Sequence, residues 1–216
     1  MNTTTKIVYE DETPRRFVLA SVVWGLVGML VGLFVLGYLA KDVVTFAKDN
    51  PTIDDMMRGI YGFSLTSATG FVGISFTVVA MLLAVYAGTH LLNAREEESA
   101  SRADHVLVGG ATRAGWLGAR LAVATCAVLV LAFLSAVGVW LGVLAGGATL
   151  SFLDALRGSF NVVPAAVLFG GLAVAAFGLA PRATAYVAFG TVTVSYVIEV
   201  LGGLSDAPSW LLDCSP

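Results

Sequence analysis

Long apolar runs alternate with short polar segments along the chain. A helix needs about 20 predominantly apolar residues to cross the roughly 30 Å hydrocarbon core of a membrane, since each residue rises about 1.5 Å. Five runs reach that length, and only the last contains a charged residue, Glu199. They are Phe17–Ala40, Gly59–Ala94, Leu121–Leu153, Gly158–Pro181 and Ala183–Leu204. The pattern predicts an all-α, polytopic transmembrane helical bundle of about five spans.

Two of these runs are longer than a membrane requires, so each should include an interfacial portion. We expect their membrane parts near Gly70–Leu92 and Leu121–Leu144. The first run is longer than the apolar region of a signal peptide, and no small-residue cleavage site follows it. We therefore expect it to remain in the protein as an anchor.

Composition supports a membrane protein. Hydrophobic residues make up 57% of the chain and charged residues 12%, against about 45–50% and about 25% in soluble domains. The net charge of −3 provides no basic surface for nucleic acid. We expect a multi-pass protein of a bacterial cytoplasmic membrane, with the lipid bilayer as its main surroundings.

The basic residues are distributed unevenly between the two ends of the predicted spans. With the N-terminus inside the cell and the C-terminus outside, eight of the 12 Lys and Arg residues face the cytoplasm. Cytoplasmic loops carry an excess of these residues. The distribution predicts an N-in, C-out orientation.

A charged segment lies between the second and third spans. It holds eight of the 27 charged residues of the chain, namely Arg95, Glu96, Glu97, Glu98, Arg102, Asp104, Arg113 and Arg120. We expect a short cytoplasmic helix from Arg95 to Val108, a break at Gly109, and a new helix capped by Thr112 that leads into span three. This loop, residues 95–120, is either a solvated connector or a docking element for a soluble partner.

Small residues at four-residue spacing indicate where the spans pack. Lipid does not drive helices together, so close approach depends on small side chains. Gly28 and Gly32 have this spacing in span one, and Gly138, Gly142 and Gly146 have it in span three. We predict helix–helix contacts at these glycines.

The segment after span one predicts a short amphipathic helix lying along the membrane surface. It reads DNPTIDDMMRGIYGF, and Thr52 and Asp55 suit a variant of the capping box. The C-terminal DAPSWLLDCSP is similar, with Trp210 suited to the membrane interface.

The sequence holds no Walker, HExxH, GxSxG or dinucleotide-binding motif. Two histidines, His90 and His105, cannot supply a haem or metal set, and the cysteines form no metal motif. We expect no metal, no cofactor and no catalytic residue on this chain.

Glu199 is the candidate functional residue inside a span. It shares a helical face with Thr191 and Ser195, which gives a polar stripe along the last span. An acid within a membrane is costly and is a functional candidate. Glu199 lies near the end of its span, so two alternatives stay open: an acid tolerated near the interface, or a residue lining a transport pathway.

Three stretches resemble type-2 ABC exporter permeases, particularly actinobacterial antibiotic or polyketide exporters. They read NAREEESASRADHVLVGGATRAGWLGARL, LAVAAFGLAPRATA and PSWLLDCSP, and the resemblance covers about Thr52–Pro216. It implies that the loop after span two docks on a separate ATP-binding subunit, with Glu96, Glu97, Arg102 and Asp104 as coupling residues. It also implies a second permease half, or a homodimer, as a partner.

The N-terminal part resembles a different family. VYEDETPRRFVLASVVWGLVGMLVGL, Val8–Leu33, is similar to the N-terminal span of the catalytic subunit of haem-copper cytochrome c oxidases. Those enzymes need histidines within the membrane that this chain lacks. We divide the chain into residues 1–50, the tail and first span, and residues 51–216, a permease-like domain of four spans. The resemblance to ABC permeases implies six spans in a permease half, of which this sequence contains five.

The resemblance implies the membrane subunit, or part of it, of an ATP-driven exporter for hydrophobic or amphiphilic compounds, with antibiotic resistance as its outcome. ATP hydrolysis would then reside on a separate subunit. The alternative is a membrane scaffold or assembly protein that transports nothing, or an inactive fragment, in the context of a respiratory oxidase.

Overall fold

The computed structural model describes residues 12–99 and 112–204, and within these ranges every regular element is a helix. This confirms the all-α fold. The elements are α1 (Glu12–Tyr38), α2 (Ala40–Asp49), α3 (Pro51–Tyr61), α4 (Ala68–Ser99), α6 (Arg113–Ala145), α7 (Phe152–Asn161), α8 (Val163–Leu179), the 3₁₀ turn η1 (Pro181–Ala183) and α9 (Thr184–Leu204).

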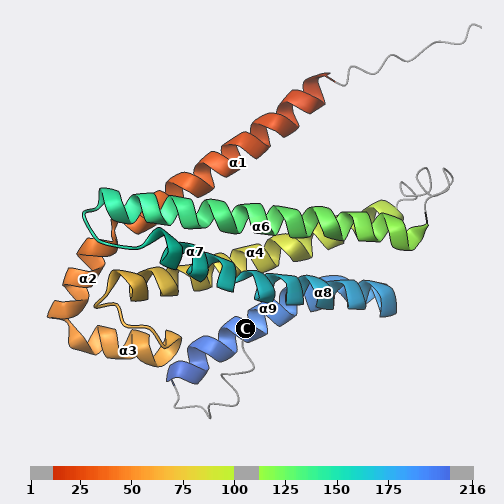
Figure 1. Cartoon of the computed structure of the whole chain (residues 1–216). Coiled ribbons are helices and arrows are strands. Elements are labelled where there is room, and N and C mark those ends of the chain that lie inside the picture. The colour runs from red at the N-terminus through yellow and green to blue at the C-terminus, as the bar shows by residue number, and fades with distance from the viewer. Residues whose placement is uncertain (1–11, 100–111, 205–216) are drawn as a thin grey trace, which may run out of the picture.

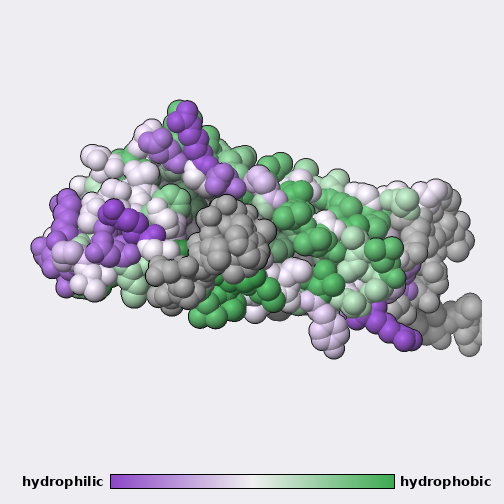
Figure 2. Space-filling model, turned by 90° about the horizontal axis from the view of Figure 1, so that it is seen from below, coloured by the Kyte–Doolittle hydropathy of each residue, from purple (hydrophilic) through white to green (hydrophobic). Residues whose placement is uncertain are grey.

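Within the described ranges, five stretches are long and apolar enough to cross a membrane, as the sequence predicts. They are Leu19–Asp49, Ala68–Glu98, Ala114–Ala145, Phe152–Leu179 and Pro181–Leu201. The expected membrane parts of spans two and three lie inside α4 and α6. Figure 2 shows hydrophilic residues gathered at the end of the bundle that holds α2 and α3, and apolar residues over its middle, as expected of a bundle that spans a membrane.

The apolar run of span three extends to Leu153, but α6 ends at Ala145, in agreement with the expected membrane part Leu121–Leu144. The predicted start of span four at Gly158 is wrong. Gly147 adopts a left-handed φ of 74°, and a short connection leads to α7. Span four then begins at Phe152 and bends where α7 passes into α8 at Val162. Pro164, which has no N–H to donate, lies in the first turn of α8 and favours a new helix start there.

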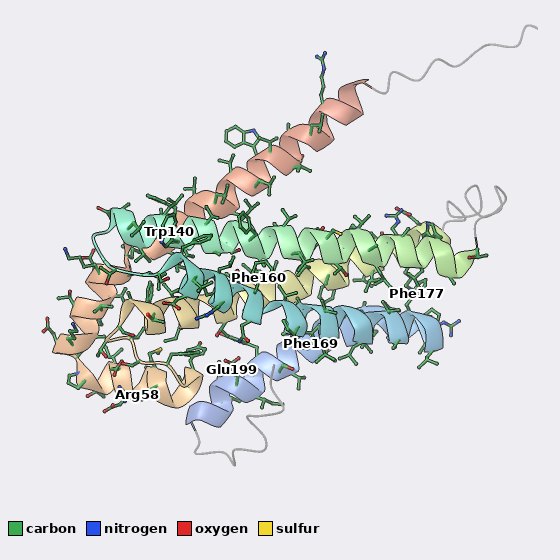
Figure 3. All side chains as sticks on the ribbon, viewed as in Figure 1. Arg58, Trp140, Phe160, Phe169, Phe177 and Glu199 are labelled. Carbon is green, nitrogen blue, oxygen red and sulfur yellow. The ribbon has the colours of Figure 1, made fainter. Side chains whose placement is uncertain are left out.

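The long helices α4 and α6 lie side by side, and α8 packs against α4 (Figure 1). Their shared core contains Val72, Phe76, Val128 and Val139. The last helix, α9, packs against α4 and α8, and it also contacts α3 at the hydrophilic end of the bundle. In Figure 3, Arg58 on α3 lies at that end and Phe177 on α8 lies toward the opposite end.

Helix α1 crosses α6 through glycines. A Cβ atom on Gly142 would collide with the carbonyl oxygen of Phe34, and one on Gly146 would collide with that of Tyr38. Gly138 faces Leu33 in the same crossing. The structure thus places the three predicted glycines of α6 at a close helix–helix contact.

The first part of α1 diverges from the bundle (Figure 1). The side chains of Val23, Trp24 and Val27 are exposed there. Nothing in the described chain lies within 4 Å of a Cβ built on Gly28 or Gly32. Their predicted role in helix packing, which would then involve another chain, stays a prediction.

The surface helix is present as α3, but its start differs from the predicted capping box. The helix begins at Pro51 with Asn50 as its N-cap residue and no side-chain cap hydrogen bond. Asn50 instead donates a 2.8 Å hydrogen bond to the carbonyl oxygen of Phe46 in α2. Because Pro51 already holds the first helical position, Thr52 is not the cap residue.

Candidate functional sites at the two ends of the bundle

Glu199 borders a cavity between α9 and the α3 end of the bundle. The cavity has a volume of about 240 Å³. Its walls come from α3, the loop after it, α4, α7, α8 and α9, and they consist of Tyr61, Phe63, Gly73, Phe76, Thr77, Ala80, Gly158, Asn161, Val162, Ala165 and Glu199. A polar group of a late helix therefore faces residues that are distant in the sequence.

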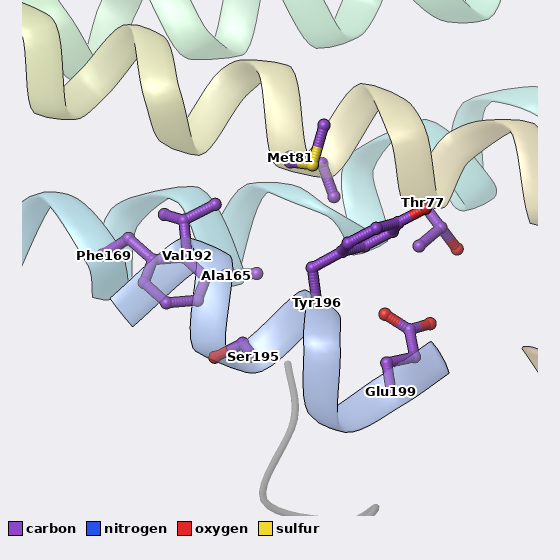
Figure 4. Close-up of a pocket in the computed structure, with 9 residues that line it drawn as sticks. Thr77, Met81, Ala165, Phe169, Val192, Ser195, Tyr196 and Glu199 are labelled. Carbon is purple, nitrogen blue, oxygen red and sulfur yellow. The ribbon is translucent and has the colours of Figure 1, made fainter. Parts of the chain in front are cut away.

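A smaller recess of about 40 Å³ adjoins this cavity. The two hollows share four wall residues, Thr77, Ala80, Ala165 and Glu199. Figure 4 shows that the recess also contains Tyr196 and Ser195 of α9, with the carboxylate of Glu199 and the ring of Tyr196 on the side of α9 that faces α4.

The predicted polar stripe is divided between neighbouring hollows. Ser195 lines the recess together with Glu199. It also lines a more open hollow of about 470 Å³ between α8 and α9, where Thr191 lies. The hydroxyl of Thr191 donates a 2.6 Å hydrogen bond to the carbonyl oxygen of Val187. The structure brings Ser195 into contact with both hollows, while Thr191 and Glu199 line different ones.

Tyr61 is a site residue that the sequence reasoning missed. Its side chain forms a hydrogen bond with Tyr196 across the boundary between α3 and α9. Burial, this hydrogen bond and the charges of Tyr196 and Glu199 raise the pKa of Tyr61 to about 12. The phenol is therefore neutral at physiological pH. No signal in the local sequence links Tyr61 to a helix more than 120 residues later.

A buried carboxylate, Asp54, holds the loop that follows α3. Its oxygen Oδ1 accepts a 2.6 Å hydrogen bond from the backbone N–H of Leu65. The hydroxyl of Ser64 lies 2.9 and 3.0 Å from the two carboxylate oxygens, and Arg58 pairs with Oδ2 at 2.9 Å. Burial alone would raise the pKa of Asp54. The hydrogen bonds and the charge of Arg58 together lower it by more than burial raises it, so the pKa lies below its ordinary value. The network fixes the loop that carries Phe63 into the cavity wall.

The other end of the bundle holds Glu96 and Glu97, two of the four predicted coupling residues. Glu97, in the last turns of α4, forms an ion pair with Arg120 of α6. The guanidinium of Arg120 also lies 5.8 Å from the ring centroid of Trp116. Thr112 caps α6, and its side chain accepts a 3.1 Å hydrogen bond from the N–H of Gly115. The predicted cap at the start of α6 is thus confirmed.

The remaining coupling residues are placed only in part. Glu96 is exposed near the end of α4, beside Glu97. Arg102, Asp104 and the predicted break at Gly109 lie outside the described residues. The structure shows that α4 itself extends through Ser99, so the first turns of the predicted cytoplasmic helix continue span two.

His90 lies on α4 a short distance from this end. Its ring stacks on that of Tyr86 with centroids 5.8 Å apart. The buried Nε2 atom has no hydrogen-bond partner among the described residues. Among residues 12–99 and 112–204, no three or more His, Cys, Asp or Glu side chains lie close enough together to form a metal site.

Comparison with known proteins identifies relatives of the chain. It is 28% identical over 192 residues to the multidrug efflux system permease protein Rv1217c of Mycobacterium tuberculosis. The alignment covers 88% of this chain and 35% of that protein, so the chain spans about a third of the length of this relative.

A family model described as "Multidrug efflux system permease Rv1217c, C-terminal domain" matches residues 15–216. The match includes the first span, the part that resembles oxidase subunits, and it lends that resemblance no support. Together with the five apolar helices, the match establishes a multi-pass protein of the bacterial plasma membrane. The chain belongs to the family of the C-terminal domain of this multidrug efflux permease.

Proposed function

We propose that this chain is the membrane-spanning permease part of an ATP-driven ABC exporter. It moves hydrophobic or amphiphilic compounds, drugs among them, out of the cell, while a separate subunit hydrolyses ATP. The family match and the similarity to a multidrug efflux permease support a role in export. The resemblance of the charged segment to ABC permeases supports the ATP-driven mechanism.

The observation that carries this proposal is the ion pair between Glu97 and Arg120. These residues flank the segment 100–111, one on each adjoining helix. Ala94 and Trp116 are also buried together at this end. A force applied to the segment would therefore act on α4 and α6 as one unit, as docking to a moving ATP-binding subunit requires.

The motion would reach the opposite end along the same helices. Helix α4 carries Thr77 and Phe76 of the cavity wall, and α6 packs against α1, α4 and α7. With the N-terminus inside, the coupling end faces the cytoplasm and the cavity lies near the outer leaflet. Alternating access then follows from relative movement of this chain and a second permease half, or a second copy of the chain.

The docking role is tested by co-purification with a co-expressed ATP-binding subunit. We expect Glu96→Ala and Glu97→Ala together to reduce co-purification and the ATPase activity of the complex. Asp154→Ala is the control, because Asp154 is also acidic and partly exposed but lies at the other end of the bundle. The size-exclusion profile of each variant checks its folding.

An ATP-binding subunit that never associates, or that associates equally with all variants, contradicts the docking role. Haem absorbance in the purified complex would instead favour the alternative of a protein in a respiratory context.

A further inference from the structure

The carboxylate of Glu199 borders the cavity with no cationic side chain of the described residues beside it. Within the described residues, no Lys, Arg or His lines either hollow that Glu199 borders. The carboxylate of Glu199 forms no hydrogen bond or ion pair with any described residue. Arg58 of α3 is already paired with Asp54 at 2.9 Å. An acid near the membrane is costly unless a counter-charge or water offsets its desolvation.

Aromatic rings surround the same space. Tyr61, Phe63 and Phe76 line the cavity, and Tyr196 lines the adjoining recess. The face of an aromatic ring attracts an organic cation within about 6 Å, and this attraction increases when water is excluded. The walls therefore suit the apolar body of a cation as well as its charge.

The remaining wall groups argue against other classes of ligand. Besides the carboxylate, the polar side chains are the neutral Thr77, Asn161, Ser195 and two tyrosines. A calcium ion takes six to eight oxygen ligands, usually including several carboxylates, and one acid with these groups does not form such a set. An anionic compound would be repelled by Glu199, and a neutral compound would leave its charge uncompensated.

We propose that this cavity binds an organic monocation with an aromatic or branched apolar body. Glu199 pairs with the positive charge, and Tyr61, Phe63 and Phe76 enclose the apolar part. The assignment of this ligand as a transported substrate rests on the proposed export function, whereas its binding does not.

Binding is measured with the purified full chain in lipid nanodiscs by equilibrium dialysis. The probe is benzyltrimethylammonium, and neopentylbenzene serves as its uncharged analogue of nearly the same shape. Empty nanodiscs of the same lipid give the amount that partitions into the membrane. We expect saturable binding of the cation, and Glu199→Gln to weaken it by about tenfold or more, as the loss of a partly buried charge pair does.

Three variants separate charge pairing from a general effect. Glu199→Asp keeps the charge and should retain most of the binding. Asp55→Asn removes an exposed acid of α3 and should leave the dissociation constant unchanged. Tyr61→Leu removes one aromatic wall and should weaken binding several-fold, which provides a second test if Glu199→Gln does not fold. Thermal unfolding of each variant shows whether the fold is retained.

Equal binding of the cation to the wild type and to folded Glu199→Gln would overturn the inference. So would equal saturable binding of neopentylbenzene, or no binding beyond that of empty nanodiscs. ATP-dependent export of the cation in vesicles is a separate measurement. Binding that depends on Glu199 without export would refute the proposed function and leave the binding site intact. Export of other compounds without such binding would do the reverse.

Discussion

The backbone N–H of Leu65 donates a 2.6 Å hydrogen bond to Oδ1 of Asp54, eleven residues earlier in the chain. This bond joins the surface helix α3 to the start of span two. Ser64 and Arg58 complete the set of donors around the same carboxylate. The loop between α3 and α4, and with it part of the cavity wall, depends on Asp54 being ionised.

We predict that acid loosens this loop before it unfolds the bundle. The pKa of Asp54 in the folded protein lies below its ordinary value of 3.8. Its stabilising contribution is therefore complete above the ordinary value and is lost as the pH falls through the lower, folded value. Hydrogen exchange of the Leu65 amide between about pH 6 and pH 2 measures the effect.

Asp54→Asn should show the loosened loop already at neutral pH, with little further change on acidification. Asp55→Asn is the matched control, since its side chain is exposed one position along. An amide at Leu65 that exchanges equally fast in the wild type and in Asp54→Asn would contradict the role of the carboxylate.

A second prediction concerns the crossing of α1 and α6. Gly142→Ala places a methyl group against the backbone of Phe34, which must shift. Overpacking of this kind costs about 1–3 kcal/mol. Chemical unfolding in detergent should show a loss of this size.

Gly118→Ala is the control for the effect of alanine in the same helix, because nothing lies within 4 Å of a Cβ at Gly118. Alanine favours a helix over glycine by up to about 1 kcal/mol, so this variant should be as stable as the wild type or slightly more stable. Equal stability changes in the two variants would rule out a tight crossing at Gly142.

A third prediction concerns the part of α1 that diverges from the bundle. If Gly28 and Gly32 pack against a second permease half or a second copy, Gly28→Leu and Gly32→Leu should reduce association without lowering the stability of the isolated chain. Val27→Phe adds bulk to another face of the same helix and should have little effect. Cross-linking in membranes measures the association. Unchanged cross-linking in both glycine variants would remove the predicted role.

The orientation gives a fourth prediction. In a background with Cys126 and Cys214 changed to Ser, Ser99→Cys should react with an impermeant thiol reagent only from the cytoplasmic side. Asp49→Cys, at the end of α2, should react only from outside. The reverse pattern would refute the N-in orientation and place the coupling residues on the wrong side for an ATP-binding subunit.

The number of spans could be predicted from the sequence because hydropathy over about 20 residues reports membrane crossing directly. The cap at Thr112 was also predictable, since a side-chain cap is a local interaction. The start of span four was not. Leu150 and Leu153 continue the apolar run of span three, although the backbone leaves α6 at Gly146 and α7 already begins at Phe152.

The cavity was predictable only at Glu199, and the adjoining recess only at Glu199 and Ser195, whose polarity is unusual within a span. The other walls of the cavity come from five further segments, and no sequence pattern shows that an apolar residue such as Phe76 borders a cavity. Asp54 was missed for a related reason. Its partners Ser64 and Leu65 lie ten and eleven residues later in the chain, and no local pattern indicates that contact.

Because the glycine crossing holds α1 near one end only, α1 can tilt about that contact like a lever. Its fulcrum lies at one end, where Phe34 and Tyr38 rest against Gly142 and Gly146, and the arm extends about 20 Å farther to Leu19. A tilt of about 10° at the fulcrum would displace the far end by roughly 4 Å. A rotation of about 10° near one leaflet would thus move the helix sideways by roughly 4 Å near the other.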